Sequence, residues 1–583
     1  MLFLFAYSRK KYYFCTNISM MKKILYTLII SLLLTSCTSS KNVESFAWNK
    51  ATVYFVLTDR FCNGDTTNDH SYNRRTDYGS EQLNASTFHG GDYVGLLQKA
   101  QEGYFKDLGV DVVWLTDPYE QIHGWTTGSG IVNDFPHYGY HGYYPLDYTE
   151  MDKNFGTIAE FRALIHELHA QGIRVMLGAN INDVGYPTFA DAIEWGYAPT
   201  DSWDSEWSPE RGEEYFQLLN DVYDYPDWFT TAWLRRPHDT TDPLQTTLYG
   251  LPDVLTENTH TVNLPTFWLR KWEQEGDNND AWTWPEMKAL RKNMPLSPSE
   301  YQILYISAWV REFGIDGYRC DVVEYVHPFR WKQLYDSCNV ALQDWRHNHP
   351  NDPASQWTEP IYFTGDHEEA FITRLPEYEA LGFASMVNMF FPKDGNLSTI
   401  TAVWQQYADS MQQWNNWMPF SYLNNAYFRD AAMDRMEDCA TSFLLAPGAV
   451  QIFYGDEVAR AMSDARYNVD AAQAFRSDYD WNNTNTQLLQ HYQRLGQWRH
   501  RHPAVGAGQQ TTLDSTTCYR TMDADEVVIA LKPVVGAPIK VPDSWNGHLV
   551  KNAYTNEIQK AQNGTVTLTQ PSANVALLEI CEY

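Results

Sequence analysis

The sequence is poor in positive charge, and this excludes several classes of partner. Lysine and arginine number 43 against 73 aspartates and glutamates, so the net charge is −30. Such a charge repels phosphate groups, and we therefore expect no nucleic-acid partner and no direct binding to anionic lipid headgroups. A neutral polymer is compatible with this surface.

Cysteine is also scarce. Two of the 8 cysteines, Cys15 and Cys37, fall in the N-terminal segment, and none of the eight shows a CxxC or other metal-type spacing. A structural zinc site is therefore not expected. The spacing leaves the pairing of the remaining six open, and these are Cys62, Cys320, Cys338, Cys439, Cys518 and Cys581.

Long apolar runs are absent apart from one near the N-terminus. Lys22 and Lys23 precede an apolar run over 24–34. This run is too short for a comfortable membrane span and is typical of an export signal. It ends in Leu-Thr-Ser-Cys at 34–37, which resembles a bacterial lipobox.

We accordingly expect residues 1–36 to form a leader, Cys37 to be lipidated and 37–47 to form a polar tether. The predicted protein is an exported bacterial lipoprotein that meets the membrane only through its lipid. Disulfides are permitted in such a compartment. An ordinary secretory signal is the alternative.

From about residue 48 the pattern alternates short β-rich runs with amphipathic helical stretches, which predicts a parallel sheet with helical crossovers. Eight such runs occur, and a (β/α)8 TIM barrel over 48–504 accounts for them. The expected strands are 53–57, 110–115, 174–177, 317–323, 361–364, 383–391, 418–423 and 449–454.

Two stretches depart from this alternation. Residues from about 186 to 300 are polar and rich in Trp, and we expect them to form an inserted subdomain after the third strand. Beyond about 505 the helical period disappears. Short β-type runs over 505–583 predict a C-terminal antiparallel β domain, with strands near 527–531 and 575–580.

Four motifs resemble glycoside hydrolase family 13, the α-amylase family, and bacterial periplasmic α-amylases in particular. The likeness runs from about Ala51 to about Thr512. The resemblance implies a barrel that cleaves α-1,4-glucosidic bonds of an α-glucan, such as starch or maltodextrin, with retention. The motifs are Thr-Phe-His-Gly-Gly-Asp at 87–92, Asp-Phe-Pro-His-Tyr-Gly-Tyr-His-Gly-Tyr-Tyr at 134–144, Gly-Ile-Asp-Gly-Tyr-Arg-Cys-Asp at 314–321 and Ala-Pro-Gly-Ala-Val-Gln-Ile-Phe-Tyr-Gly-Asp-Glu at 446–457.

Retaining hydrolysis needs a nucleophilic carboxylate and a protonated carboxylic acid about 5–5.5 Å apart. The resemblance makes Asp321 the nucleophile. Arg319 lies two residues earlier, on the same face of a strand, so its guanidinium can hold Asp321 ionised; a structural ion pair is the alternative. Tyr143 matches the ring on which the family stacks its sugar, and His141 lies on the same loop.

The acid predicted by the resemblance is altered. After the glycine of Phe-Thr-Gly at 363–365 the family has glutamate, whereas this chain has Asp366, which is one methylene shorter. A misplacement of that size can lower the rate about 10²-fold. Glu368 or Glu369 could substitute only across a local bulge.

The family's third carboxylate, which holds the sugar hydroxyls, is absent. Where the family has His-Asp, this chain has Ala426 and Tyr427. The loss of one preorganised contact lowers the rate on the order of 10²–10³-fold. Tyr427 also adds bulk at the place of the sugar, and Asp430 would need a register shift to serve.

The end of the third strand is altered as well. The family pattern Asp-Val-Val-x-Asn-His reads Gly-Ala-Asn-Ile-Asn-Asp over 178–183. Asn182 is retained, Gly178 replaces the first aspartate, and Asp183 replaces the histidine that contacts the sugar. We expect Asp183 and Tyr427 to face the substrate in place of the family's residues.

An oxygen-rich loop over 59–69 resembles the calcium loop of many family members. Ca²⁺ takes six to eight oxygen ligands; a turn whose Asn and Asp side chains cap their own backbone is the alternative. A second calcium would use Asn182 and Asp253. The expected ligands of the first are Asn63, Asp65, Asn68, Asp69, the backbone of Gly90 and Asp92.

Three hypotheses follow. The chain is an active α-glucan hydrolase that uses Asp321 and Asp366, a catalytically impaired glucan-binding lipoprotein on an amylase frame, or a hydrolase or transglycosylase for another α-glucoside. The frame and the order of the motifs do not separate them.

Overall fold

The computed structural model describes residues 46–581 apart from 75–85, 128–135, 198–228, 236–239, 249, 368–371, 415–416 and 463–470. The expected leader, Cys37, most of the expected tether, Glu368 and Glu369 lie outside the described residues. Within the part described, no helix combines the length and the apolar character that a membrane-spanning helix needs.

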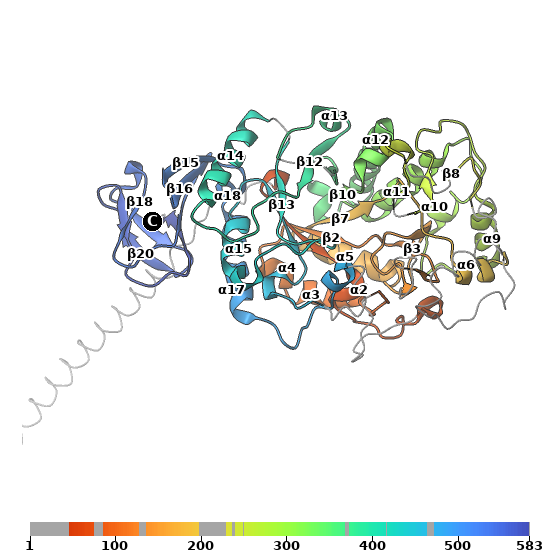
Figure 1. Ribbon diagram of the computed structural model, residues 1–583, viewed down its shortest axis with the longest axis horizontal. Coiled ribbons are helices and arrows are strands. Elements are labelled where there is room, and N and C mark those ends of the chain that lie inside the picture. Colours follow the sequence, from red (N-terminus) through yellow and green to blue (C-terminus); the bar gives the residue numbers. More distant parts are fainter. Residues whose placement is uncertain are drawn as a thin grey trace, which may run out of the picture.

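A closed barrel of eight parallel strands forms the centre of the molecule (Figure 1). Each of the eight runs expected from the sequence supplies one barrel strand, so the predicted (β/α)8 barrel is confirmed. The strands are β1 (Thr52–Val56), β2 (Val112–Leu115), β7 (Arg174–Ala179), β10 (Gly317–Cys320), β11 (Tyr362–Gly365), β12 (Phe383–Asn388), β13 (Phe420–Tyr422) and β14 (Ala449–Phe453).

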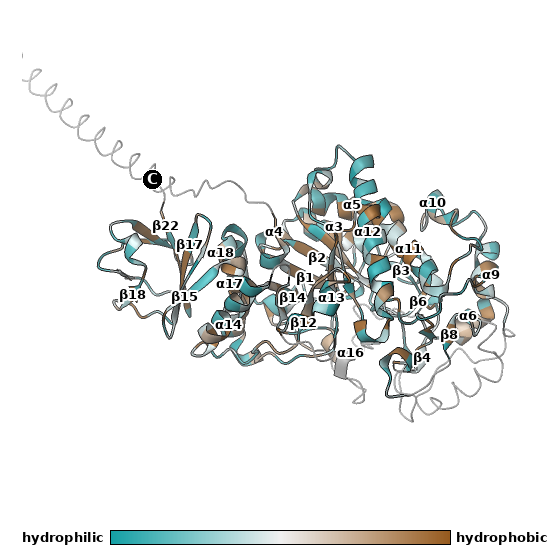
Figure 2. Cartoon of the chain, turned by 90° about the horizontal axis from the view of Figure 1, so that it is seen from above, coloured by the Kyte–Doolittle hydropathy of each residue, from teal (hydrophilic) through white to brown (hydrophobic). Residues whose placement is uncertain are grey.

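The barrel strands read as continuous apolar runs because helices cover their outer face and side chains fill the interior. Every residue of β1, β2, β7 and β10 is buried. Inside the barrel the rings of Phe55 and Trp114 stack, with centroids 3.7 Å apart. Figure 2 shows hydrophobic residues along the inner strands and hydrophilic residues on the outer helices and loops.

The covering helices begin and end where their sequences provide caps. Helix α5 (Ile158–Ala170) starts after a capping box formed by Thr157 and Glu160. Helix α11 (Pro298–Phe313) starts after a second capping box and ends at Gly314, whose φ of 72° suits glycine. Other helices around the barrel are α3 (Tyr93–Gln101), α12 (Pro328–Asn348), α14 (Ile400–Gln413), α15 (Met436–Leu444) and α17 (Thr486–Arg501).

Two segments extend the barrel. After β2 the chain forms an antiparallel pair, β3 (Tyr119–Gln121) with β6 (Pro145–Met151). Between β7 and β10 lies the region expected as an insertion, which contains α6 (Phe189–Glu194), α9 (Thr266–Glu275) and α10 (Pro285–Lys288). Both views place α9 and α10 at the end of the molecule opposite the C-terminal strands (Figures 1 and 2).

The C-terminal strands form the expected antiparallel β domain. A six-stranded sheet has the order β15-β16-β17-β22-β19-β20, beside a two-stranded sheet of β18 and β21. Trp545, which is fully buried, lies in the core between them. The strands are β15 (Gln509–Asp514), β16 (Thr517–Met522), β17 (Asp525–Leu531), β18 (Pro538–Lys540), β19 (Leu549–Asn552), β20 (Glu557–Lys560), β21 (Thr565–Thr567) and β22 (Val575–Ile580).

Candidate active site

Asp321 and Asp366 lie at the carboxyl ends of adjacent barrel strands. Asp321 follows β10, and its N–H donates to the carbonyl of Ala179 on β7 at 3.1 Å. Asp366 follows β11, and its N–H donates to the carbonyl of Cys320 at 3.0 Å. The parallel ladder therefore brings both carboxylates to the rim of the barrel where active sites of this fold lie.

The guanidinium of Arg319 contacts both of these carboxylates. One terminal nitrogen donates to Asp321 and the other to Asp366. Arg319 is 6% exposed, whereas the Asp366 side chain keeps 30% of its surface accessible. One buried cation thus holds the two carboxylates together, which is compatible with the spacing of about 5–5.5 Å of a retaining pair. It also engages an oxygen of the predicted acid.

The backbone after Asp321 is strained. Val322 has a φ of 40°, in the left-handed region that β-branched residues rarely adopt. Such a conformation costs on the order of 1–3 kcal/mol and persists where the surrounding structure enforces it, often at a functional site. The next N–H, that of Val323, donates to the carbonyl of Asp366 at 3.0 Å. This bond ties the two site segments together.

His141 and Tyr143 form one wall of the site. Their rings stack with centroids 5.2 Å apart, and Nδ1 of His141 accepts the N–H of Tyr143 at 3.1 Å. Burial, reinforced by Arg476, lowers the pKa of His141 well below its usual range. A neutral ring that accepts at Nδ1 carries its proton at Nε2. That buried Nε2 has no partner among the described residues, so it can donate to a ligand oxygen.

Tyr427 extends this wall. Its ring lies 6.0 Å from that of Tyr143, and the guanidinium of Arg476 lies 5.0 Å from the Tyr427 ring centre. Ala426 is buried, and its carbonyl accepts from Arg476 at 3.0 Å. Asp430 is exposed and pairs with Lys393 at 3.0 Å. An aromatic side chain therefore stands beside Tyr143 where the resemblance predicts a carboxylate.

The carboxylate of Asp183 is held by two amides of its own turn. Its carboxylate accepts from the amide of Asn180 at 2.5 Å and from that of Asn182 at 3.4 Å. Asp183 also forms a β-bridge with Asp253, which is paired with Arg235. Asp253, one of the two residues expected for a second calcium, is thus already paired with a guanidinium.

A small cavity of about 10 Å³ lies between the stacked wall and Asp321. The residues that line it include Tyr143, His141, Arg319 and Asp321, together with Asp117, which no sequence motif predicted. Burial raises the pKa of Asp117 to about 7. Gly178 on the neighbouring strand β7, where the family has an aspartate, was the feature of the sequence that could have pointed to Asp117.

The predicted calcium loop contains oxygen atoms that lack partners. Oδ1 of Asn63 and Oδ1 of Asn68 are buried without a hydrogen bond to any described residue. The amide of Asn63 donates to Asp69 at 2.9 Å. A Cβ at Gly90 would lie 2.5 Å from both Asn63 and Asp69, so only glycine allows this close approach. The donor set fits a hard cation such as Ca²⁺.

The other two side chains expected at this calcium already serve the backbone. Asp92 caps α3 by accepting the N–H of Gly95 at 2.7 Å, and it also accepts the N–H groups of Gly64 and Asp65. Asp65 accepts the N–H of Thr67 at 2.9 Å. Each carboxylate has further lone pairs, so these bonds order the loop without excluding coordination.

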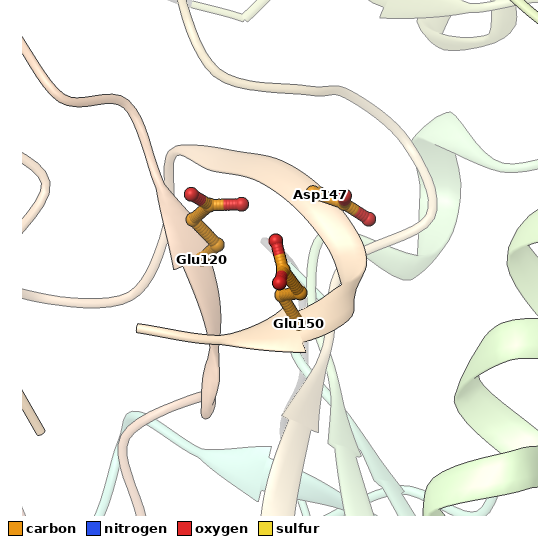
Figure 3. Close-up of side chains that lie close together, drawn as sticks. All are labelled: Glu120, Asp147 and Glu150. Carbon is orange, nitrogen blue, oxygen red and sulfur yellow. The ribbon is translucent and has the colours of Figure 1, made fainter. Parts of the chain in front are cut away.

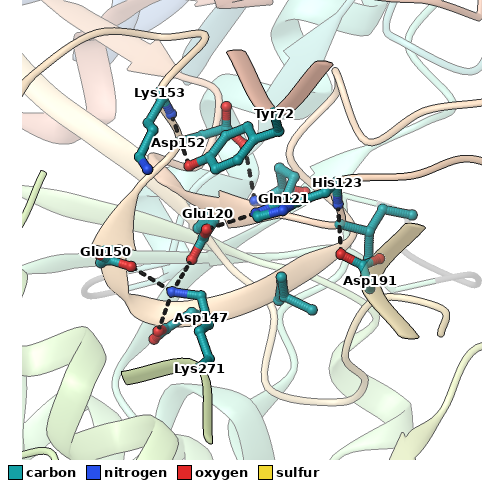
Figure 4. Close-up of polar contacts among 12 residues, drawn as sticks. Tyr72, Glu120, Gln121, His123, Asp147, Glu150, Asp152, Lys153, Asp191 and Lys271 are labelled. Carbon is teal, nitrogen blue, oxygen red and sulfur yellow. Dashed lines mark hydrogen bonds and ion pairs between the residues drawn. The ribbon is translucent and has the colours of Figure 1, made fainter. Parts of the chain in front are cut away.

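A second acidic group lies on β3 and β6. Glu120, Asp147 and Glu150 present carboxylate oxygens within 4.8 Å of one another (Figure 3). The ammonium of Lys271 lies among them, 2.6 Å from Glu120 and 3.2 Å from Asp147 (Figure 4). A buried ammonium supplies the charge that a metal would bring. We therefore assign this cluster to Lys271 and not to a metal.

The comparisons with known proteins agree with this geometry. The family profile described as the catalytic domain of alpha amylase matches residues 55–504. The periplasmic alpha-amylase of Escherichia coli K12 is 36% identical over 499 residues, which cover 80% of this chain and 69% of that protein. The beta/alpha-amylase of Paenibacillus polymyxa is 24% identical over 90% of this chain, which spans only 37% of that longer protein.

Solved structures show the same fold. An alpha-amylase from Anoxybacillus superposes with a TM-score of 0.62 at 19% identity, over 92% of this chain and 99% of that one. An alpha-amylase from Geobacillus thermoleovorans, solved in complex with acarbose, gives a TM-score of 0.59 at 18% identity over 92% and 100%.

Proposed function

This chain belongs to the α-amylase family of glycoside hydrolases, and on that premise we propose that it hydrolyses α-1,4-glucosidic bonds of an α-glucan with retention, at a reduced rate. The observation that carries the proposal is the pair of rim carboxylates, Asp321 and Asp366, both held by Arg319. Tyr143 beside this pair supplies an aromatic face on which a glucose ring can stack.

In the proposed mechanism, Asp321 attacks the anomeric carbon as the bond to the leaving sugar breaks. Asp366 gives its proton to the leaving oxygen and later takes one from the water that hydrolyses the glycosyl-enzyme. Arg319 keeps Asp321 ionised and aligned. The neutral His141 donates from Nε2 to a sugar oxygen.

Two features support a low rate. The carboxyl of Asp366 is a methylene short, which can cost about 10²-fold. Tyr427 replaces a carboxylate, and the loss of one such contact lowers the rate on the order of 10²–10³-fold. The two losses are not strictly additive, but together they leave a fraction of the family's acceleration.

The test is release of reducing sugar from starch by the purified chain. Asp321→Asn should abolish the release, whereas Asp344→Asn should not change it. Asp344 is a suitable control because it is a half-exposed aspartate on the outer helix α12, paired with Arg311. Release that survives Asp321→Asn would overturn the assignment of the nucleophile.

The second candidate is a glucan-binding protein without turnover. It is favoured by Tyr427, which stands where the third carboxylate would be, and by the engagement of Asp366 with Arg319. Retardation of the chain on a starch-containing gel, with no sugar released at any enzyme concentration, would select this candidate.

We also propose that Asn63, Asp65, Asn68, Asp69, Gly90 and Asp92 hold one Ca²⁺. The two unpartnered amide oxygens support this proposal. The ion would cross-link the loop at 59–69 to the turn before α3, and it takes no part in the chemical steps.

Finally, we propose that the chain is exported and anchored through a lipid on Cys37. The apolar run and the lipobox-like tetrapeptide support this localisation. Cys37→Ser should move the protein from the membrane fraction to the soluble fraction, and unchanged fractionation would contradict the anchor.

A further inference from the structure

Gly178 on β7 and Asp117 after β2 share one space. The N–H of Gly178 donates to Oδ1 of Asp117 at 2.6 Å. A Cβ placed on Gly178 would lie 2.2 Å from that oxygen and 2.9 Å from Oδ2. A side chain at 178 would therefore collide with the Asp117 carboxylate where it now lies, and this carboxylate would have to turn away, so the two positions compete for one place.

The family resemblance places an aspartate at the position of Gly178. We propose that Asp117 has taken over this carboxylate from the neighbouring strand, and that it contacts a hydroxyl of the bound sugar. The proposal rests on the proposed function for its ligand, an α-linked glucose unit. It adds a substrate-binding residue that no family motif of this sequence indicates.

The surroundings of Asp117 suit this role. Asp117 lines the cavity that Tyr143, Arg319 and Asp321 also line, and it is 5% exposed. Within the described part of the chain its only hydrogen bond is the one from Gly178. Its second oxygen is therefore available to a single sugar hydroxyl that reaches this small cavity.

The charge of Arg319 also acts on this group. The positive guanidinium lies close enough to favour the ionised form of Asp117, and burial opposes it. A carboxyl balanced in this way can accept from one sugar hydroxyl or, when protonated, donate to another. Because a pyranose offers hydroxyls that both donate and accept, either state suits the proposed ligand.

A purely structural role for Asp117 predicts a different effect of Asp117→Asn. An asparagine keeps the size and the oxygen that accepts the Gly178 N–H, so a structural role tolerates Asp117→Asn. A sugar-binding role does not, because the group facing the cavity changes its charge and its hydrogen-bonding pattern.

The experiment exchanges the carboxylate between the strands in the full chain. The variants are Asp117→Asn, Asp117→Ala, Gly178→Asp and the double variant Asp117→Ala/Gly178→Asp, with Asp344→Asn as the control. Maltotriose binding is measured by calorimetry, and the melting temperature is measured for each variant without ligand.

We expect Asp117→Asn and Asp117→Ala to raise the Kd for maltotriose by about 10- to 100-fold, the usual effect of losing a hydrogen bond to a charged group. Gly178→Asp alone should lower the melting temperature by several degrees, because it places two carboxylates in one space. The double variant should recover the melting temperature and most of the affinity.

Unchanged binding by Asp117→Asn and Asp117→Ala would overturn the sugar-binding role. A double variant that melts no higher than Gly178→Asp would overturn the exchange of the carboxylate. If the unmodified chain binds no maltooligosaccharide, the proposed function fails and the binding role falls with it, whereas the exchange is still decided by the melting temperatures.

Discussion

Asp366 reaches the rim of the barrel on a short side chain, and Arg319 contacts the oxygen that it presents. A glutamate at this position would carry its carboxyl one methylene further from the backbone. The third carboxylate raises a separate problem, since Tyr427 fills its place beside Tyr143. The molecule therefore keeps the fold of the family but differs from it at individual residues of the site.

We predict that activity can be raised by restoring the family's residues. Asp366→Glu should increase kcat on maltooligosaccharides by about 10²-fold, the cost of a misplaced group. Adding Ala426→His and Tyr427→Asp should increase it by a further 10²–10³-fold, roughly the value of one preorganised contact. The measurement is kcat and KM for each step of the series.

The control is the same series on an Asp321→Asn background, which should remain inactive throughout. If Asp366→Glu leaves kcat unchanged while Ala426→His and Tyr427→Asp raise it, the shortened acid is not what limits the rate.

At the scale of elements, Lys271 on α9 holds the inserted region against the antiparallel pair β3 and β6. It contacts Glu120 on β3, Asp147 and Glu150 on β6, and Glu275 on its own helix. Burial would lower the pKa of Lys271, but these carboxylates outweigh burial and raise it well above its usual range. Because β6 follows directly after the loop of His141 and Tyr143, the network supports the wall that we propose to bind the sugar.

We predict that Lys271→Met destabilises the fold by about 3–5 kcal/mol, because it leaves buried carboxylates without their cation. Thermal unfolding monitored by circular dichroism measures the loss. The matched control is Lys288→Met, whose partner Asp280 has a side chain 83% exposed. A surface pair of this kind contributes about 0–1 kcal/mol. Equal melting temperatures for the two variants would contradict the role of Lys271.

The sequence predicted the barrel because each strand is a short apolar run and the runs recur between helical periods. It located all eight barrel strands, and β10 with Asp321 came from a motif long enough to be specific. The network of Lys271 could not be predicted, because its partners Glu120 and Glu150 lie more than a hundred residues away along the chain. Periodicity contains no information on such pairs.

Strands β16 and β20 were not expected, for a different reason. They alternate buried and exposed residues only weakly, and β20 (Glu557–Lys560) is mostly polar. Their place in the sheet is set by their neighbours β17 and β19. Asp117 was not predicted either, because its proposed role depends on the absence of a side chain at Gly178, which lies on another strand.

At the scale of the whole molecule, the proposed calcium joins the segment after β1 to the segment before α3. We predict that EDTA lowers the melting temperature, because an ion that binds only the folded state at 100 to 1,000 times its Kd stabilises it by about 2.7–4.1 kcal/mol. Added Ca²⁺ should restore the original value. Asn63→Ala should make the melting temperature insensitive to both additions, and an unmodified chain that EDTA leaves unchanged would contradict the site.

The shared space of Asp117 and Gly178 also limits the evolutionary path to this active site. A lineage that gained Asp117 while it still carried the family's aspartate at 178 would have had two carboxylates in one volume. A lineage that first lost the side chain at 178 would have had only an empty pocket. We therefore expect that the glycine came first, so ancestral sequences on this branch should contain Gly178 before they contain Asp117.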